Sequence, residues 1–494
     1  MVHLTRDTCF TLFYRAASNR TGRINLAFHS LNRTMLAAPK VLTLNKTQIN
    51  LVLFSLNRTF VPKLQFMKRE DFEIMAPVGS RESLAAAIHA GANSIYFGIG
   101  KLNMRSHSAN AFTIDDLKEI AQICHEHGLK SYLTVNTIIY GEDIDTMHEI
   151  IDAAKEARIS AVIASDVAVM TYCRKVDQEV HLSTQLNISN IEALKFYAQF
   201  ADVVVLAREL NMWQVRDIYE QIVAQDIRGP KGELVRIEMF CHGALCMAIS
   251  GKCYLSLQNA GRSANRGECV QICRRAYEVK DIETGTELAV DNKYIMSPKD
   301  LKTVRFIDVM MNSGVRVLKI EGRARGPEYV KTVVEAYDQA INAVIHDNDH
   351  PDEPKQFTDE AKDAWDKSLM TVFNRGFWDG YYQGQKLGEW CDVYGSKATE
   401  KKIYCGKCTK YFAKIGVAEF LVENCDIKAT DKMLVTGPTT GALIQPVDEI
   451  RLDEKPVESA KKGDFISIKV NERVRLNDRL FVLFNDESQQ LTQK

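Results

Sequence analysis

Short apolar runs alternate with amphipathic stretches along the middle of the chain. The runs recur at intervals of roughly 20–40 residues and are typical of buried parallel strands. The stretches between them have the spacing of helices; one begins with the cap signal Thr-Ile-Asp-Asp and ends at Gly128. The eight runs read FEIMAP, SIYFG, KSYLTVN, AVIAS, EVHLST, DVVVLA, VRIEMF and VRVLKIEG.

Eight strands with helices between them predict an α/β fold in which the strands close into a TIM-barrel-like (β/α)8 body. An open, doubly wound sheet is the alternative. In a barrel, active residues lie at the carboxyl ends of the strands. In this chain those ends carry Pro77, Asn136, Asp166, Gln185, Arg208, His242, Glu321 and Arg323.

The pattern changes after the last of these runs, which divides the chain. We expect the barrel to occupy residues 67–345, followed by a linker and helical segment over 346–398. Residues 399–494 contain short alternating strands with Gly, Asp and Asn turns. They predict a small C-terminal antiparallel β-barrel.

Residues 1–66 form a basic extension with nine Lys or Arg and one acid, Asp7. An Asn-(Arg/Lys)-Thr motif recurs there at Asn19, Asn32, Asn45 and Asn57. We interpret the segment as an extension that is disordered or not native, with Met67 as the natural start. A transit peptide and a glycosylated secreted segment are the alternatives.

Charge and hydropathy exclude some classes of protein. Removing the extension leaves 54 Lys or Arg against 63 Asp or Glu, a net charge of −9, so no global charge indicates nucleic-acid binding. No apolar run approaches the roughly 18 residues of a membrane helix. Twelve cysteines are too few for a secreted disulfide scaffold of this length, and we expect a cytoplasmic protein.

The cysteines cluster in a polar loop over residues 241–275, directly after the seventh run. Four of them have the spacing C-x6-C-x15-C-x3-C, and Cys241 precedes them. A loop so rich in Gly, Ser, Asn and Arg cannot form much core, so we expect a metal centre to hold it. The four candidate ligands are Cys246, Cys253, Cys269 and Cys273.

Three interpretations of this cluster are open. The loose spacing favours an iron–sulfur cluster, because structural zinc sites use tight knuckles and only the last pair comes close to one. A zinc site and buried free cysteines are the alternatives. Arginines within the loop would offset the thiolates or bind an anionic ligand, namely Arg262, Arg266, Arg274 and Arg275.

A second pair, Cys405 and Cys408, forms a lone C-x2-C with Cys391 and Cys425 nearby. We interpret these residues as strand cysteines, with half of a zinc knuckle as the alternative. The chain has no G-x-S-x-G, H-E-x-x-H or G-x-x-x-x-G-K-[ST] motif, so no motif supplies an activated nucleophile for peptide hydrolysis.

The cysteine loop resembles the signature of the collagenase-like peptidases, family 32 among those of unassigned mechanism. The resemblance rests on EMFCHGALCMAISGKCYLS with RSANRGECVQICR, and extends to MAPVGSRESLAAAIHAGANSIYFG, SPKDL, KIEGRARGPEYV and FNRGFWDGYY. In layout the chain is most similar to the prephenate-dependent proteins that convert the wobble uridine of tRNA to 5-hydroxyuridine without O2.

The resemblance implies a [4Fe–4S] cluster, prephenate as co-substrate and tRNA as partner. Its motif places the ligands at Cys246, Cys253, Cys269 and Cys273. Many relatives carry a further cysteine where this chain has Lys302, and some use that cysteine as a ligand in place of the one that corresponds to Cys273.

A dicarboxylate such as prephenate needs cationic partners, ideally bidentate arginines. The candidates are Arg208, Arg262, Arg266 and Arg323. His242 and Glu321 are candidate catalytic acid–base groups at strand ends. Two other functions remain open: a metal-dependent peptidase, which rests on the family name, and a non-catalytic RNA-binding protein stapled by zinc.

Overall fold

The computed structural model describes residues 24–27, 41–44, 67–106, 112–285 and 294–485. The chain divides into two units, Met1–Gln65 and Phe66–Lys494. In the first unit, β1 (Ile24–Ala27) pairs antiparallel with β2 (Val41–Leu44). The prediction that residues 1–66 are disordered or not native otherwise concerns residues outside the described ranges.

Eight parallel strands close into a barrel, as the apolar runs predict. Closure comes from β11, which pairs with β3 on one side and with β9 on the other, so the open-sheet alternative is wrong. The strands are β3 (Glu73–Pro77), β4 (Ser94–Phe97), β5 (Lys130–Val135), β6 (Ala161–Ala164), β7 (Val180–Leu182), β8 (Val203–Val205), β9 (Arg236–Gly243) and β11 (Val315–Ile320).

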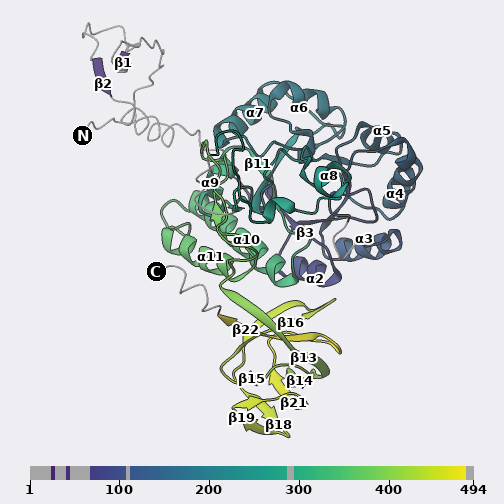
Figure 1. Ribbon diagram of the computed structural model, residues 1–494, viewed down its shortest axis with the longest axis vertical. Coiled ribbons are helices and arrows are strands. Elements are labelled where there is room, and N and C mark those ends of the chain that lie inside the picture. Colours follow the sequence, from purple (N-terminus) through teal and green to yellow (C-terminus); the bar gives the residue numbers. More distant parts are fainter. Residues whose placement is uncertain (1–23, 28–40, 45–66, 107–111, 286–293, 486–494) are drawn as a thin grey trace. The chain divides into compact units, whose positions relative to one another are not determined.

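Helices form a ring outside the barrel (Figure 1). In α3 the buried positions Leu117, Ile120, Ala121 and Cys124 follow the period that faces a helix toward a core. No helix within the described ranges combines the length and apolar character needed to cross a membrane. The ring consists of α2 (Arg81–His89), α3 (Leu117–Glu126), α4 (Ile144–Glu156), α5 (Val167–Lys175), α6 (Ile191–Ala198), α7 (Met212–Ala224), α9 (Ile307–Asn312) and α10 (Pro327–Asp349).

Two short strands extend the sheet beyond the barrel. β10 (Asp300–Lys302) pairs antiparallel with the end of β9, and β12 (Phe377–Trp378) pairs parallel with β10. α10 runs to Asp349, four residues past the expected end of the barrel domain, and α11 (Asp359–Thr371) follows it. The segment after residue 345 is therefore partly built into the barrel.

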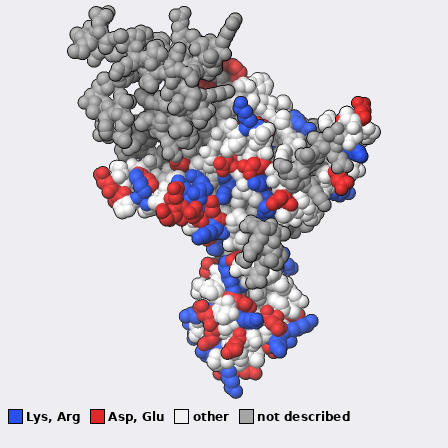
Figure 2. All heavy atoms as spheres, turned by 60° about the vertical axis from the view of Figure 1, so that its left-hand side comes forward, with Lys and Arg blue, Asp and Glu red and all other residues white. Residues whose placement is uncertain are grey.

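The outer faces of the helices carry charges of both signs. Exposed ion pairs bridge neighbouring helices, such as Lys118 with Glu156 at 2.7 Å. On the face shown in Figure 2, Lys and Arg side chains are interspersed with Asp and Glu side chains over the barrel and the C-terminal strands.

The C-terminal strands form an antiparallel sheet, which we call the C-terminal β domain (residues 400–485). Its order is β17-β16-β22-β13-β14-β21-β18-β19, with β15 and β20 paired separately. The strands are β13 (Glu400–Phe412), β14 (Val417–Val422), β15 (Ile427–Lys428), β16 (Lys432–Gly437), β17 (Gly441–Pro446), β18 (Ile450–Leu452), β19 (Lys455–Val457), β20 (Ser459–Ala460), β21 (Phe465–Lys469) and β22 (Arg479–Asn485).

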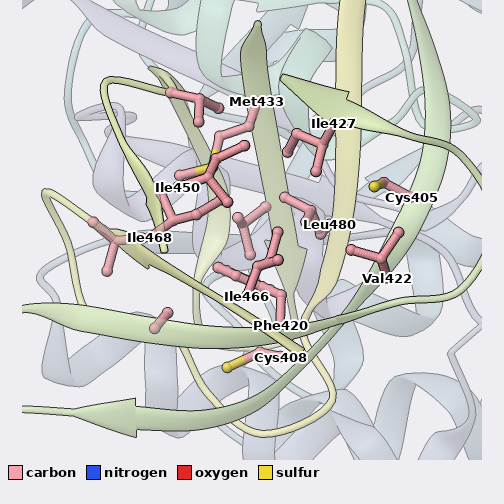
Figure 3. Packing of buried hydrophobic residues seen from close by; sticks show 14 of the residues in the cluster. Cys405, Cys408, Phe420, Val422, Ile427, Met433, Ile450, Ile466, Ile468 and Leu480 are labelled. Carbon is pink, nitrogen blue, oxygen red and sulfur yellow. The ribbon is translucent and has the colours of Figure 1, made fainter. Parts of the chain in front are cut away.

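The cysteines of the C-x2-C motif belong to the core of this domain. Cys405 and Cys408 are fully buried among apolar side chains, and their sulfur atoms lie apart on different sides of the cluster (Figure 3). Burial raises the pKa of Cys408 to about 11, so the thiol stays protonated. Cys405 and Cys408 both lie in β13, as their interpretation as strand cysteines predicts, whereas Cys391 and Cys425 lie outside the strands.

The barrel interior contains an ion pair among apolar side chains. Lys319 Nζ donates to Glu238 Oε1 at 2.7 Å, and the two side chains are 7% and 0% exposed. The second carboxylate oxygen of Glu238 has no hydrogen-bond partner and lies 4.0 Å from His181 Nδ1. Glu238 therefore depends on Lys319 to balance its buried charge.

We expect Lys319→Met to lower the free energy of unfolding by about 3–5 kcal/mol, because it leaves the Glu238 charge buried without a partner. Urea denaturation measures this loss. The double variant Lys319→Met/Glu238→Gln removes both charges and should recover part of the stability. A single variant as stable as the wild type would contradict the assignment of this ion pair.

Candidate functional site

Charged side chains from separate loops meet at the carboxyl end of the barrel. Arg105 Nη2, from the loop after β4, donates to Glu321 Oε1 at 2.7 Å; Glu321 directly follows β11. The two side chains remain 32% and 18% exposed, so solvent reaches the pair. Although burial alone raises the pKa of Glu321, the charges of Arg105, Arg323 and Arg208 hold it below its usual value.

Arg323 is the most enclosed of these arginines, with 8% exposure. Its Nη1 atom donates to two neutral oxygens, Thr134 Oγ1 at 2.9 Å and Asn103 Oδ1 at 3.2 Å. Gly98 makes room for it, because a Cβ atom at that position would lie 2.4 Å from Nη1. Burial lowers the pKa of Arg323 to about 10, which still leaves the guanidinium charged at neutral pH.

Arg208 completes what we call the arginine group: Arg105, Arg208 and Arg323 around Glu321. Arg208 Nη2 donates to Ser250 Oγ at 2.7 Å, and its guanidinium lies 5.4 Å from the ring centre of Phe240. Arg105 forms the ion pair with Glu321, and the charges of Arg323 and Arg208 act on the same carboxylate from further away. The excess of positive charge suits an anionic ligand that can accept paired hydrogen bonds.

Tyr96 forms the support beneath the carboxylate. Its hydroxyl oxygen lies 2.8 Å from the Ile320 carbonyl oxygen and 3.3 Å from Glu321 Oε2. Lys319 Nζ lies 4.7 Å from the centre of the Tyr96 ring. Burial raises the pKa of Tyr96 well above its usual value, so the hydroxyl remains a hydrogen-bond donor.

The cysteine-rich loop lies across the mouth of the barrel, and we call residues 244–275 the lid. It contains α8 (Leu255–Ala260), η5 (Ala264–Arg266) and η6 (Ile272–Arg274). Figure 1 shows α8 over the centre of the ring of helices. The lid contacts four loops of the barrel. Gly267 contacts Ser106 after β4, and Asn265 contacts Ile138 after β5. Gly251 lies against Gln185 after β7, and Ser250 binds Arg208 after β8.

Further contacts of Gly267 and Arg266 explain why these two residue types occur in the lid. Gly267 has φ +80°, and a Cβ atom there would lie 2.1 Å from the Asn103 carbonyl oxygen, so no other residue fits without a shift. Arg266 donates from Nη1 and Nη2 to the two carboxylate oxygens of Asp143, at 2.5 and 3.1 Å, and Nη1 also donates to the Ile138 carbonyl oxygen. Arg266 thus fastens the lid.

The four predicted cysteines share one neighbourhood in the lid. Cys246 is exposed, and the others are partly buried. Burial raises the pKa of Cys273, the Arg274 charge lowers it, and the other three thiols raise it further: Cys246, Cys269 and Cys253. The four thiols therefore act on one another electrostatically, but no three of them are grouped as a site for one metal ion.

The lid also borders the arginine group, because Ser106 Oγ, next to Arg105, donates to the Gly267 carbonyl oxygen at 3.2 Å. The charge of Glu321, and to a smaller degree that of Cys269, raises the pKa of Arg105. Arg274 ties the thiol segment to the barrel by donating to the carbonyl oxygens of Leu245 at 2.6 Å and Pro298 at 2.8 Å. In the described part of the chain, no three His, Cys, Asp or Glu side chains are grouped as a site for one metal ion.

His242 does not join the other predicted residues. Its ring lies among aromatic side chains, with ring centres 5.3 Å away for Phe377, 5.7 Å for Tyr337 and 6.0 Å for Tyr329. Burial, and secondarily the Lys302 charge, lowers its pKa to about 3, so the ring is neutral. This environment is that of a packed side chain, and the arrangement gives no support to the predicted acid–base role.

The remaining predictions divide between the rim and the surface. Arg262 is exposed on the lid, outside the arginine group. Asp166 caps α5 by accepting from Ala168 N, and Asn136 Oδ1 accepts from Met104 N. Lys302 pairs with Asp366 at 2.7 Å.

Arg105 and Tyr96 were not among the site residues predicted from the sequence. Tyr96 lies within an apolar run, where the alternation of a strand does not distinguish it from core. Arg105 follows the run SIYFG in the polar stretch KLNMRSHS, so its position after a barrel strand was the available signal.

Comparisons with known proteins agree with this organisation. A family model described as peptidase family U32 matches residues 79–392. A collagenase of Porphyromonas gingivalis is 62% identical over 415 residues, covering 84% of this chain and 98% of that protein. An uncharacterized protease of Methanocaldococcus jannaschii is 35% identical, covering 83% and 98%. The tRNA hydroxylation protein P1 of Bacillus subtilis is 34% identical, covering 64% and 74%.

We expect Arg105→Met to destabilise the protein by about 2 kcal/mol near neutral pH, because Glu321 loses its charged partner. The depressed pKa of Glu321 in the wild type means that its stabilising contribution exists above its unfolded value of 4.5 and is lost as the pH falls through the folded pKa. In the variant, burial raises that pKa. The stability difference should therefore shrink as the pH falls.

Chemical denaturation at about pH 7 and about pH 4 measures the difference. Arg81→Met is the matched control, because Arg81 pairs with Asp116 and Glu119 at the exposed surface and should cost under about 1 kcal/mol. A difference for Arg105→Met that stays constant with pH would contradict the coupling to Glu321.

Proposed function

Because the chain belongs to peptidase family U32, we propose that it is a tRNA-modifying enzyme that hydroxylates the wobble uridine to 5-hydroxyuridine without O2. The proposal takes prephenate as co-substrate and a [4Fe–4S] cluster as cofactor. The observation that carries it is the seating of the cysteine-bearing lid on the loop that carries Arg105, where Ser106 Oγ donates to the Gly267 carbonyl oxygen at 3.2 Å.

The donor set of the lid fits an iron–sulfur cluster. Cys246, Cys253, Cys269 and Cys273 would hold it through their thiolates. Such a cluster would supply one-electron transfer. The buried Arg274 guanidinium next to Cys273 would offset the negative charge of the thiolates.

The arginine group fits a dicarboxylate co-substrate. Arg323 and Arg208 would bind carboxylates, because the hydrogen bonds of both go to neutral oxygens and leave their charges unmatched. Arg105 and Glu321 would fix the position of the ligand. The Glu321 carboxylate would accept a proton from it or return one. The lid would limit the access of water to this rim.

A relative supports RNA as the substrate class. The Bacillus subtilis protein is named for tRNA hydroxylation, and its similarity covers 64% of this chain. In the proposal, tRNA is therefore the partner that supplies the uridine.

A peptidase is the second candidate, favoured by the name of the 62% identical collagenase. Peptide hydrolysis needs an activated nucleophile or a metal-bound water. His242, a strand-end imidazole, is enclosed by aromatic rings, and its pKa, lowered to about 3 by burial, makes it a weak base. The rim residues therefore favour anion binding over hydrolysis.

We expect anaerobically purified protein to contain about four iron and four sulfide per chain. Cys253→Ser and Cys269→Ser should lose most of both, because each removes one thiolate ligand. Metal and sulfide analysis measures the loss. Cys408→Ala is the matched control, because this thiol lies in the core of the C-terminal β domain and should leave the iron content unchanged. Zinc without iron would favour the zinc-stapled RNA-binding protein instead.

We expect tRNA from a deletion strain to lack 5-hydroxyuridine derivatives at the wobble position, as measured by nucleoside mass spectrometry. Re-expression of the wild type should restore them. Arg323→Met should restore them poorly, because it removes the buried guanidinium, with a loss of at least about tenfold at limiting co-substrate. Unchanged wobble nucleosides in the deletion strain, together with cleavage of gelatin by the purified protein, would support the peptidase.

A further inference from the structure

The outer surface of the lid exposes apolar side chains in one short stretch. Tyr254 is 75% exposed, Ile249 51%, Met247 41% and Leu257 40%. The inner side of the same stretch is anchored, since Leu245 and Ser256 are only 8% and 1% exposed. The outward side chains are therefore not required to pack the lid, and an exposed apolar cluster of this kind marks an interaction surface.

The charge of this stretch differs from that of the body around it. The sequence contains no Asp or Glu between Glu238 and Glu268, whereas Lys252 and Arg262 are both exposed within it. The chain without its extension has a net charge of −9. The lid therefore presents a local cationic surface on an acidic body, which selects for an anionic partner.

The same surface adjoins the thiols. Met247 follows Cys246 and Tyr254 follows Cys253, so two of the exposed apolar side chains stand next to two of the candidate ligands. A partner that stacks on Tyr254 is thereby placed beside the thiols and above the barrel mouth.

We propose that this surface, comprising Met247, Ile249, Lys252, Tyr254, Leu257 and Arg262, docks unpaired RNA, with Tyr254 as the stacking platform for a base. An exposed aromatic ring flanked by cations is the combination that binds single-stranded nucleic acid, because every base has a face that stacks and every phosphate carries a charge. A duplex hides its base faces and meets only the two cations. The proposal rests on the proposed function, and it names the face by which the tRNA approaches.

Fluorescence anisotropy of a labelled anticodon stem-loop RNA with cluster-loaded protein tests the docking surface. Tyr254→Ala should weaken binding by about tenfold or more, and Tyr254→Phe should retain it, because the phenyl ring still stacks. Tyr394→Ala is the matched control, since Tyr394 is 73% exposed outside the lid, and it should bind like the wild type. Arg262→Gln should reduce the slope of log affinity against log salt by about one.

Several outcomes overturn the docking surface. They are equal binding by Tyr254→Ala and the wild type, an equal loss in Tyr394→Ala, equal affinity for a fully paired duplex, or Tyr254-dependent binding of gelatin in place of RNA. Iron content and wobble nucleosides report separately on the proposed function. A protein that restores 5-hydroxyuridine while Tyr254→Ala binds RNA normally refutes only the docking surface, whereas unchanged nucleosides and no RNA binding by the wild type refute both.

Discussion

Unbalanced positive charge at the barrel mouth is the constraint on which the rest of this site depends. Glu321 serves three guanidinium groups, and Arg323 is buried against neutral oxygens. Burying cations without matching carboxylates costs stability unless another negative group compensates. In the barrel, Tyr96, Asn103 and Thr134 fix the positions of the guanidinium groups. The compensating negative charge is left to a ligand or to the thiolates of the lid.

The lid depends on the barrel for its shape. It has little apolar core of its own, and contacts with four different barrel loops hold it in place. Arg266 and Arg274 do this with charged side chains that reach the Asp143 carboxylate and the Pro298 carbonyl oxygen beyond the lid. A segment fastened this way keeps three of its thiols partly buried at the rim and leaves Cys246 exposed.

The eight strands were predictable because each is a short run buried on both faces, and such runs stand out against helical periodicity. The rim positions of Arg208, Glu321 and Arg323 were predictable from one rule, that the active residues of a barrel lie at the carboxyl ends of its strands. The surroundings of His242 were not predictable, because the pairing of β9 with β11 shifts register at Cys241 and such an irregularity redirects the next side chain. Arg105 was missed because a loop has no period from which its direction can be read.

The pKa of Arg323, lowered only to about 10, has a bearing on regulation. Its charge does not change over the range of acidity that cells experience, and the depressed pKa of Glu321 keeps that carboxylate ionised over the same range. Proton concentration is thus a poor signal for loading this rim with an anion. Under the proposed function, control over turnover would come from the supply of the small molecule, from the redox state of the thiols, or from the arrival of the macromolecular partner.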